Sequence, residues 1–210
     1  MELKDLTVTG FCDITASDAP APGGGSVSAL AGTLAAALGE MVARLTVGKE
    51  KYAQVQPEME RLLEELPPVR QRLLEAIDRD SRAFDRYMAA LTLPKGTSEE
   101  KEARKNAMQE GLKEAAQVPL EVARAAVSLF PALELVVTRG NSNAVTDGMV
   151  GTMLARSAVL GALFNVRVNL GSIHDAAFVE ALDRETRTLQ EQALRWERQI
   201  LGQTELAGLE

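Results

Sequence analysis

The chain has 210 residues and a formal net charge of −7, and 46% of its residues are hydrophobic although only 4% are aromatic. This length predicts one domain over residues 1–210, and a core of Ala, Leu, Val and Met favours an all-α fold over strands. No cluster of Lys and Arg marks a basic face, so we expect no nucleic-acid partner.

Cysteine content and hydropathy point to the cytoplasm. Cys12 is the only cysteine, which excludes an internal disulfide and fits a reducing compartment. The first residues carry no apolar signal core. The longest apolar run, residues 27–39, is shorter than the roughly 20 residues that a membrane-spanning helix needs. We therefore expect a cytoplasmic protein with no membrane partner.

A short helix is expected over residues 3–15, and a glycine-rich turn with the sequence Pro-Ala-Pro-Gly-Gly-Gly-Ser follows at residues 20–26. The prolines stiffen this turn, and its glycines allow close approach of other groups. Ser26 is expected to cap a helix of small residues that runs to about Gly48. Free N–H groups at such a helix start can hold a carboxylate or phosphate, although a plain loop before a packed helix has the same pattern.

The next helix is expected to open at Pro57 and to break or kink at residues 67–68, which are both proline. An amphipathic helix then continues to about residue 91. Its apolar stripe is interrupted at Asp80, whereas Asp78 and Asp85 point elsewhere. Since an ionised, unpaired carboxylate on a buried face is costly, Asp80 is at the edge of the core, paired, or kept for chemistry.

Residues 97–100 form a capping box, Thr-Ser-Glu-Glu, which predicts a helix from there to about residue 117. Pro119 is expected to start another helix and Pro131 to end it. Residues 133–137 are ambiguous between helix and strand.

A second turn cluster at residues 139–143 precedes another helix of small residues. Small residues recur on it at steps of three or four: Gly148, Gly151, Ala155, Ala158 and Ala162. The helix after the glycine-rich turn has a similar stripe in Gly32, Ala36 and Gly39. We expect these two helices to pack closer than the usual 8–10 Å or so. That packing would bring the glycine-rich turn, Asp147 and the Asn141/Asn143 turn into one cleft.

The last helix is expected to be capped by Ser172, with Asp175 in its first turn. Its apolar residues, from Val179 to Ile200, form a heptad-like seam. This seam could pack on the bundle or on a second subunit.

The sequence contains no motif that is typical of a metal or nucleotide site. His174 is the only histidine, and neither H-E-x-x-H nor C-x-x-C is present. No Gly-Lys-Ser/Thr follows the glycine run, which excludes a P-loop. What remains is acid–base chemistry, for which Asp80, Asp147 and Lys49 are the candidates. Lys49 can also be explained as a cation at a helix end.

Four stretches together resemble the cyclodeaminase domain of formiminotransferase-cyclodeaminase and its stand-alone relatives, the methenyltetrahydrofolate cyclohydrolases. They are residues 20–26, residues 45–49 with Tyr52, residues 140–143 with Asp147, and residues 165–173. The resemblance covers almost the whole chain in order. It implies an all-helical homodimer that binds a folate substrate without a metal or redox cofactor.

The resemblance also implies an enzyme of folate one-carbon chemistry, in one of two forms. A cyclodeaminase joins N10 to the formimino carbon on N5 and releases ammonia, whereas a cyclohydrolase adds water to the methenyl carbon. Both need proton transfer, so we expect Asp80 or Asp147 to be the base and Lys49 the acid or electrostatic partner.

The expected substrate-binding residues are Gly23, Gly24, Gly25, Ser26, Tyr52, Asn141, Asn143 and Asn169. Among these, Ser26 and the amides of the three glycines would hold substrate oxygens or the glutamate tail. The alternative is a non-catalytic helical scaffold or binding dimer that keeps the fold, because fold alone does not establish function.

Overall fold

The computed structural model describes residues 2–208, and all its regular structure in that range is helical. This confirms the predicted all-α fold, and residues 133–137 lie in a helix. The α-helices are α1 (Val8–Thr15), α2 (Gly24–Thr46), α3 (Gln56–Leu91), α4 (Ser98–Val127), α5 (Phe130–Arg139), α6 (Val145–Leu170) and α7 (Ala176–Leu201). Short 3-10 turns are η1 (Leu3–Asp5), η2 (Glu50–Val55), η3 (Ser142–Ala144) and η4 (Glu205–Ala207).

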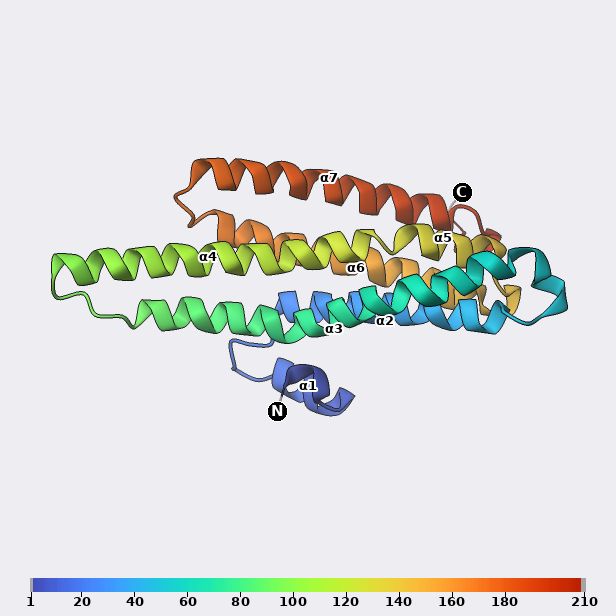
Figure 1. The fold of residues 1–210 in the computed structure, drawn as a ribbon, viewed down its shortest axis with the longest axis horizontal. Coiled ribbons are helices and arrows are strands. Elements are labelled where there is room, and N and C mark those ends of the chain that lie inside the picture. Colours follow the sequence, from blue (N-terminus) through green and yellow to red (C-terminus); the bar gives the residue numbers. More distant parts are fainter. Residues whose placement is uncertain (1, 209–210) are drawn as a thin grey trace.

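The helices lie side by side in a long bundle (Figure 1). The longest pair, α3 and α4, forms a hairpin whose closed end projects beyond the rest of the bundle. Behind that hairpin lie α2 and α6, whereas α7 runs along one edge and α1 projects below. The α7 seam faces the bundle, because the Trp196 ring stacks on Phe130 with centroids 6.2 Å apart and Ile200 is fully buried.

Helices α2 and α6 pack closely through their small residues, as predicted. A Cβ placed on Gly32 would lie 3.4 Å from the Cβ of Ala158, and one on Gly151 would lie 3.4 Å from the carbonyl oxygen of Ala35. Since Gly32 precedes Ala35 while Ala158 follows Gly151, the two helices run antiparallel.

The proline pair in α3 does not break the helix, so of the two predicted outcomes, a break or a kink, the break is wrong. Pro67 and Pro68 lack the N–H groups that would bond the carbonyls of Leu63 and Glu64. Both of these residues are at least partly exposed, so water can replace the missing donors. The helix therefore continues unbroken to Leu91.

The predictions for Pro119 and Pro131 were also wrong. Helix α4 opens with the predicted capping box but continues through Pro119 to Val127. Pro131 does not end a helix; it lies in the first turn of α5. A proline fits there because the N–H groups of the first turn have no helical partner to lose.

Three helix starts differ from the prediction. Residues 3–15 divide into η1 and α1, because Thr7 accepts a hydrogen bond from the N–H of Gly10 and caps a new helix. Helix α2 begins at Gly24, with Gly23 instead of Ser26 at the N-cap. Asp175, instead of Ser172, caps α7. The predicted end of α2 is confirmed, since Gly48 follows it with a φ of 77°, a left-handed value that favours glycine.

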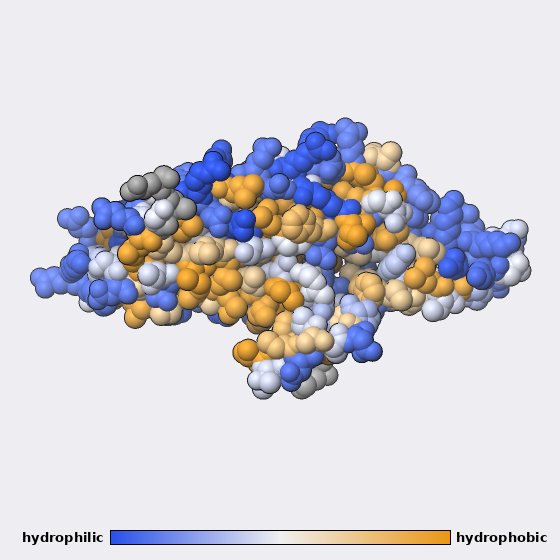
Figure 2. Space-filling model, turned by 180° about the vertical axis from the view of Figure 1, so that it is seen from behind, coloured by the Kyte–Doolittle hydropathy of each residue, from blue (hydrophilic) through white to orange (hydrophobic). Residues whose placement is uncertain are grey.

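The side of the bundle formed by α2 and α6 carries a broad apolar patch, which we call the back face (Figure 2). Its exposed residues are Val27, Leu34, Met41 and Leu45 from α2 and Val150, Met153, Phe164 and Val168 from α6. Contrary to the expectation from run length, α2 and the segment Ser142–Leu170 are long and apolar enough to span a membrane by length and composition alone. Both also supply core residues to this bundle.

Candidate functional site

The glycine-rich turn borders a hollow of about 350 Å³ at the start of α2. Its walls come from the turn, α3, α4 and α6: Pro20, Ala21, Gly23, Gly25, Asp80, Ser81, Phe84, Ala115, Asn165, Val168 and Asn169. This size is within the range of small-molecule sites. Four of the predicted residues, namely Gly23, Gly25, Asp80 and Asn169, therefore meet in one hollow.

Asp80 lies directly against the first turn of α2. The hydroxyl of Ser26 is 3.0 Å from the Oδ2 atom of Asp80 and 3.0 Å from the carbonyl oxygen of Ile77. A Cβ placed on Gly25 would overlap the Asp80 carboxylate. Glycine at position 25 is thus a condition for this placement of the carboxylate.

The pKa of Asp80 is raised, because burial disfavours the charged carboxylate. The hydroxyl and the backbone N–H of Ser26 oppose this shift by stabilising the ionised form. A raised pKa makes a carboxylate a stronger proton acceptor. Asp80 is therefore suited to the base role predicted for it.

Asn169 supplies a hydrogen bond that the backbone of α4 lacks. Because Pro119 has no N–H, the carbonyl of Ala115 loses its helical donor. The Nδ2 atom of Asn169 donates to that carbonyl at 2.9 Å and to the carbonyl of Asn165 at 2.8 Å. Its Oδ1 atom accepts no hydrogen bond within residues 2–208, so this oxygen is the part of Asn169 that can meet a ligand.

The sequence prediction missed Asn165 as a residue of this hollow. Its Nδ2 atom donates to the carbonyl of Gly161 at 2.9 Å and would lie 3.1 Å from a Cβ on Gly24. Asn165 is four residues before Asn169, hence on the same face of α6. This four-residue spacing from Asn169 is the feature of the sequence that could have identified Asn165.

Asp78 was also missed, because the prediction placed it away from the core. The structure buries it: its Oδ1 atom accepts the N–H of Leu3 at 2.6 Å, and its Oδ2 atom accepts the N–H of Lys4 at 3.4 Å. Asp78 therefore ties η1 to α3, two residues before Asp80.

Of the other predicted residues, Gly24 and Ser26 lie in the first turn of α2 beside this hollow. The remaining five lie at the other end of α2, and we call them the second cluster: Lys49, Tyr52, Asn141, Asn143 and Asp147. Hydrogen bonds from Asn141 link the start of η3 to the end of α2. Its backbone N–H donates to the Thr46 hydroxyl and its Nδ2 to the carbonyl of Leu45, both at 2.9 Å. Its Oδ1 accepts the N–H of Asn143 at 3.1 Å.

Tyr52 is the group with the most perturbed pKa in the second cluster. Its hydroxyl is 3.0 Å from the hydroxyl of Ser142 and accepts the Ser142 N–H at 2.9 Å. These two bonds, with smaller contributions from Lys51, lower the pKa of Tyr52 to about 8. A phenol of this kind can exchange a proton near neutral pH, a property that the sequence did not reveal.

The two clusters are far apart in one chain. Asp147 and Asn165 are separated by 18 residues of α6, or about 27 Å at the α-helical rise. The prediction of a single cleft was therefore wrong for an isolated chain. The reason is the antiparallel packing, which places the start of α2 beside the end of α6 and leaves the start of α6 at the opposite end.

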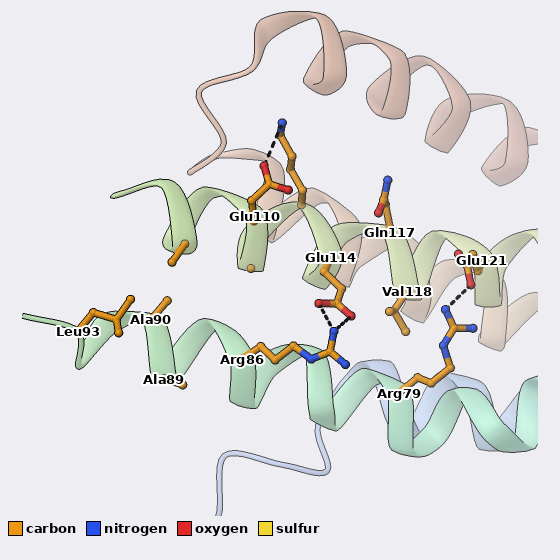
Figure 3. Close-up of a pocket in the computed structure, with 13 residues that line it drawn as sticks. Arg79, Arg86, Ala89, Ala90, Leu93, Glu110, Glu114, Gln117, Val118 and Glu121 are labelled. Atoms are coloured by element: carbon orange, nitrogen blue, oxygen red, sulfur yellow. Dashed lines mark hydrogen bonds and ion pairs between the residues drawn. The ribbon is translucent and has the colours of Figure 1, made fainter. Parts of the chain in front are cut away.

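A larger hollow of about 650 Å³ lies between α3 and α4 (Figure 3). Arg86 pairs with Glu114 at 2.6 Å, and Arg79 pairs with Glu121 at 2.7 Å. Two ion pairs thus cross the groove, and none of the predicted site residues lines it. The smaller hollow at Asp80 is the better candidate site.

Within residues 2–208 no three His, Cys, Asp or Glu side chains form a group that could hold a metal ion.

Comparison with known proteins agrees on one family. The sequence model of the formiminotransferase-cyclodeaminase family matches residues 7–188. The chain is 40% identical over 187 residues to methenyltetrahydrofolate cyclohydrolase from Methylorubrum extorquens, covering 89% of this chain and 90% of that protein. It is 42% identical over 172 residues to formimidoyltransferase-cyclodeaminase from Gallus gallus, of which it spans only 32%. The crystal structure of formiminotetrahydrofolate cyclodeaminase from Thermotoga maritima superposes with a TM-score of 0.87 at 32% identity, covering 97% of this chain and 98% of that one.

Proposed function

Because the chain belongs to the formiminotransferase-cyclodeaminase family, we propose that it is a folate one-carbon enzyme acting on N5- or N10-substituted tetrahydrofolate. The observation that carries this proposal is the partly buried Asp80 carboxyl, with its raised pKa, in a hollow bordered by the glycine-rich turn. The family comparison supports both a cyclohydrolase and a cyclodeaminase. In both reactions Asp80 would take a proton from the attacking nucleophile.

In the cyclodeaminase reaction, N10 attacks the formimino carbon on N5 and Asp80 takes the proton that N10 loses. The tetrahedral centre then expels its amino group, which leaves as ammonia after gaining a proton. In the cyclohydrolase reaction, water attacks the methenyl carbon and Asp80 takes a proton from that water. The carbon-bound hydroxyl then loses its proton as the bond from this carbon to N5 breaks, N5 gains a proton, and 10-formyltetrahydrofolate is formed. Positioned acid–base groups of this kind typically accelerate reactions by about 10²–10⁴-fold.

The test follows the near-ultraviolet absorbance of 5,10-methenyltetrahydrofolate. Loss of this absorbance above the spontaneous rate identifies a cyclohydrolase, and its appearance from 5-formiminotetrahydrofolate identifies a cyclodeaminase. Asp80→Asn is the matched control and should abolish whichever change occurs. No change with either compound, together with no folate binding, would replace the proposal by the scaffold function.

The proposal includes a homodimer formed through the back face. Phe164 and Val168 are 62% and 72% exposed, which is unusual for large apolar side chains in so apolar a patch. Val168 also lines the Asp80 hollow, so this face reaches the candidate site. A second copy of the chain is the occupant that this continuity favours.

A twofold axis that lies in the plane of the back face, at right angles to the helices, would also bring the two clusters together. Such an axis sets α2 antiparallel to its copy, so the start of one α2 meets the end of the other. The Lys49 and Asp147 ends of one copy would then approach the Asp80 hollow of the other. In this arrangement the predicted cleft lies between two subunits and would bind the folate without a metal or redox cofactor.

A further inference from the structure

The hydroxyl of Ser26 has two acceptors and only one hydrogen. Asp80 Oδ2 and the carbonyl oxygen of Ile77 both lie 3.0 Å from Ser26 Oγ, and Ser26 is fully buried. Since a hydroxyl donates one hydrogen at a time, it can serve only one of them. We infer that Ser26 is a positioning residue that turns its hydrogen from Asp80 to Ile77 when Asp80 gains a proton. The inference rests on the proposed function of Asp80 as a base.

Both protonation states of Asp80 fit the same heavy-atom positions. When Asp80 is ionised, Ser26 donates to Oδ2 and stabilises the negative charge. When Asp80 is protonated, its O–H donates to Ser26 Oγ, and the Ser26 hydrogen turns to the carbonyl of Ile77. A separation of 3.0 Å suits a hydrogen bond in either direction. Proton transfer therefore needs only a rotation of one hydrogen, which avoids reorganisation of the site.

The geometry assigns this task to Ser26 rather than direct contact with the substrate. Ser26 is fully buried and is not part of the wall of the hollow, whereas Asp80 is. Ile77 and Asp80 are both on α3, three residues apart, so the two acceptors stay together if α3 shifts against α2. Ser26 thus acts through Asp80.

Among residues 2–208, no charged side chain other than Asp80 itself lines the hollow. From α2, α4 and α6 only neutral groups line the hollow, among them Gly25, Ala115, Asn165 and Asn169. On α3 itself the neighbours in the hollow are Ser81 and Phe84, which are also neutral. Within residues 2–208 the Ser26 hydroxyl is therefore the side-chain group that stabilises the ionised form of Asp80.

The test compares Ser26→Ala with Ser28→Ala. Ser28 lies on the same helix and is also buried, but its hydroxyl donates to the carbonyl of Gly24 at 2.6 Å and does not contact Asp80. The Asp80 carboxyl is titrated by carbon-13 NMR, with Asp80→Asn used to assign its signal. Ser26→Ala should raise the titration midpoint of Asp80 by about one pH unit, the order of a hydrogen bond to a charged group. Ser28→Ala should leave it unchanged.

The pH profile of kcat/KM gives a second, independent readout. Its acid limb should move upward with the NMR midpoint in Ser26→Ala. An unmoved NMR midpoint in folded Ser26→Ala would overturn the inference. A moved midpoint with an unmoved rate profile would support the coupling of Ser26 to Asp80 but contradict the proposed role of Asp80 as base. Should Ser26→Ala fail to fold, Ser26→Cys keeps the size and a weaker donor, and it should raise the midpoint by a smaller amount.

Discussion

The Asp80 carboxylate fills the space that a side chain at position 25 would need. Gly25 therefore does not only allow a turn; it leaves room for the carboxylate at the start of α2.

Gly25→Ala tests this relationship. The added methyl should force the Asp80 side chain out of its place and lower kcat by roughly 10²-fold or more, comparable to loss of the base itself. Far-ultraviolet circular dichroism should stay unchanged, because alanine is a better helix former than glycine. Gly171→Ala is the control, since its Cβ would meet only the carbonyl oxygen of Val168, at 3.8 Å. Wild-type kinetics in Gly25→Ala would contradict the site.

Asp80→Asn should change how stability depends on pH. The raised pKa of Asp80 means that the folded state holds a proton more tightly than the unfolded state does. The ionised carboxyl thus costs stability, and this cost grows as the pH rises from about 4, the ordinary Asp range, through the raised pKa. Urea unfolding should show Asp80→Asn gaining stability over wild type across that interval. A constant difference at all pH values would argue against a raised pKa.

Tyr52 should ionise below the ordinary tyrosine pKa of about 10. Near-ultraviolet absorbance should show a tyrosinate step at a pH of about 8, and Tyr52→Phe should remove it. Ser142→Ala should move the step upward, because the Ser142 hydroxyl is the largest cause of the lowered pKa. The depressed pKa also stabilises the fold: this contribution is complete above the ordinary tyrosine pKa of about 10 and is lost as the pH falls from there through about 8.

Two inactive variants should restore activity to each other if the site lies between subunits. A mixed dimer of Asp80→Asn and Lys49→Ala carries both changes in one site and leaves the other site intact. After random reassociation, about a quarter of the sites should be active, because half of the dimers are mixed. No recovery in verified mixed dimers would show that each subunit works alone.

The role of the back face as a dimer interface can be tested without measuring activity. If the proposed dimer forms through this face, Phe164→Glu should sediment as a monomer, because a charge cannot be buried there without a partner. Binding of the wild type to neutral liposomes, with no dimer in solution, would instead make this face a membrane contact.

Asn169→Ala should destabilise the fold by roughly 1–3 kcal/mol, because the Ala115 carbonyl loses its donor. In a Pro119→Ala background the backbone N–H at position 119 can replace that donor, so the cost should shrink. A double-mutant cycle by urea unfolding measures the difference. An equal cost in both backgrounds would mean that the amide does not compensate for the proline.

The elements that local patterns determine were predictable from the sequence. The small-residue stripes predicted that α2 and α6 pack together, and the gap in the α3 stripe identified Asp80. Both follow from helical periodicity alone. The capping box at Thr97 likewise marked the start of α4.

What could not be predicted depends on contacts between distant residues. Pro119 stays in a helix because Asn169, on another helix, supplies the missing hydrogen bond. Ser26 is not the N-cap because its hydroxyl is used by Ile77 and Asp80. The separation of Asp147 from Asp80 follows from the direction in which α2 and α6 pack, which glycine spacing does not encode.

The close fit of α2 against α6 makes the length of α2 as constrained as its composition. Deleting one residue from the middle of α2 would rotate its beginning by about 100° and shift it by about 1.5 Å relative to its end. Gly32 and Gly25 could then no longer face Ala158 and Asp80 while Gly39 kept its own contacts. Homologous enzymes with this site should therefore keep both the small residues of this helix and the spacing between them, with no insertion or deletion.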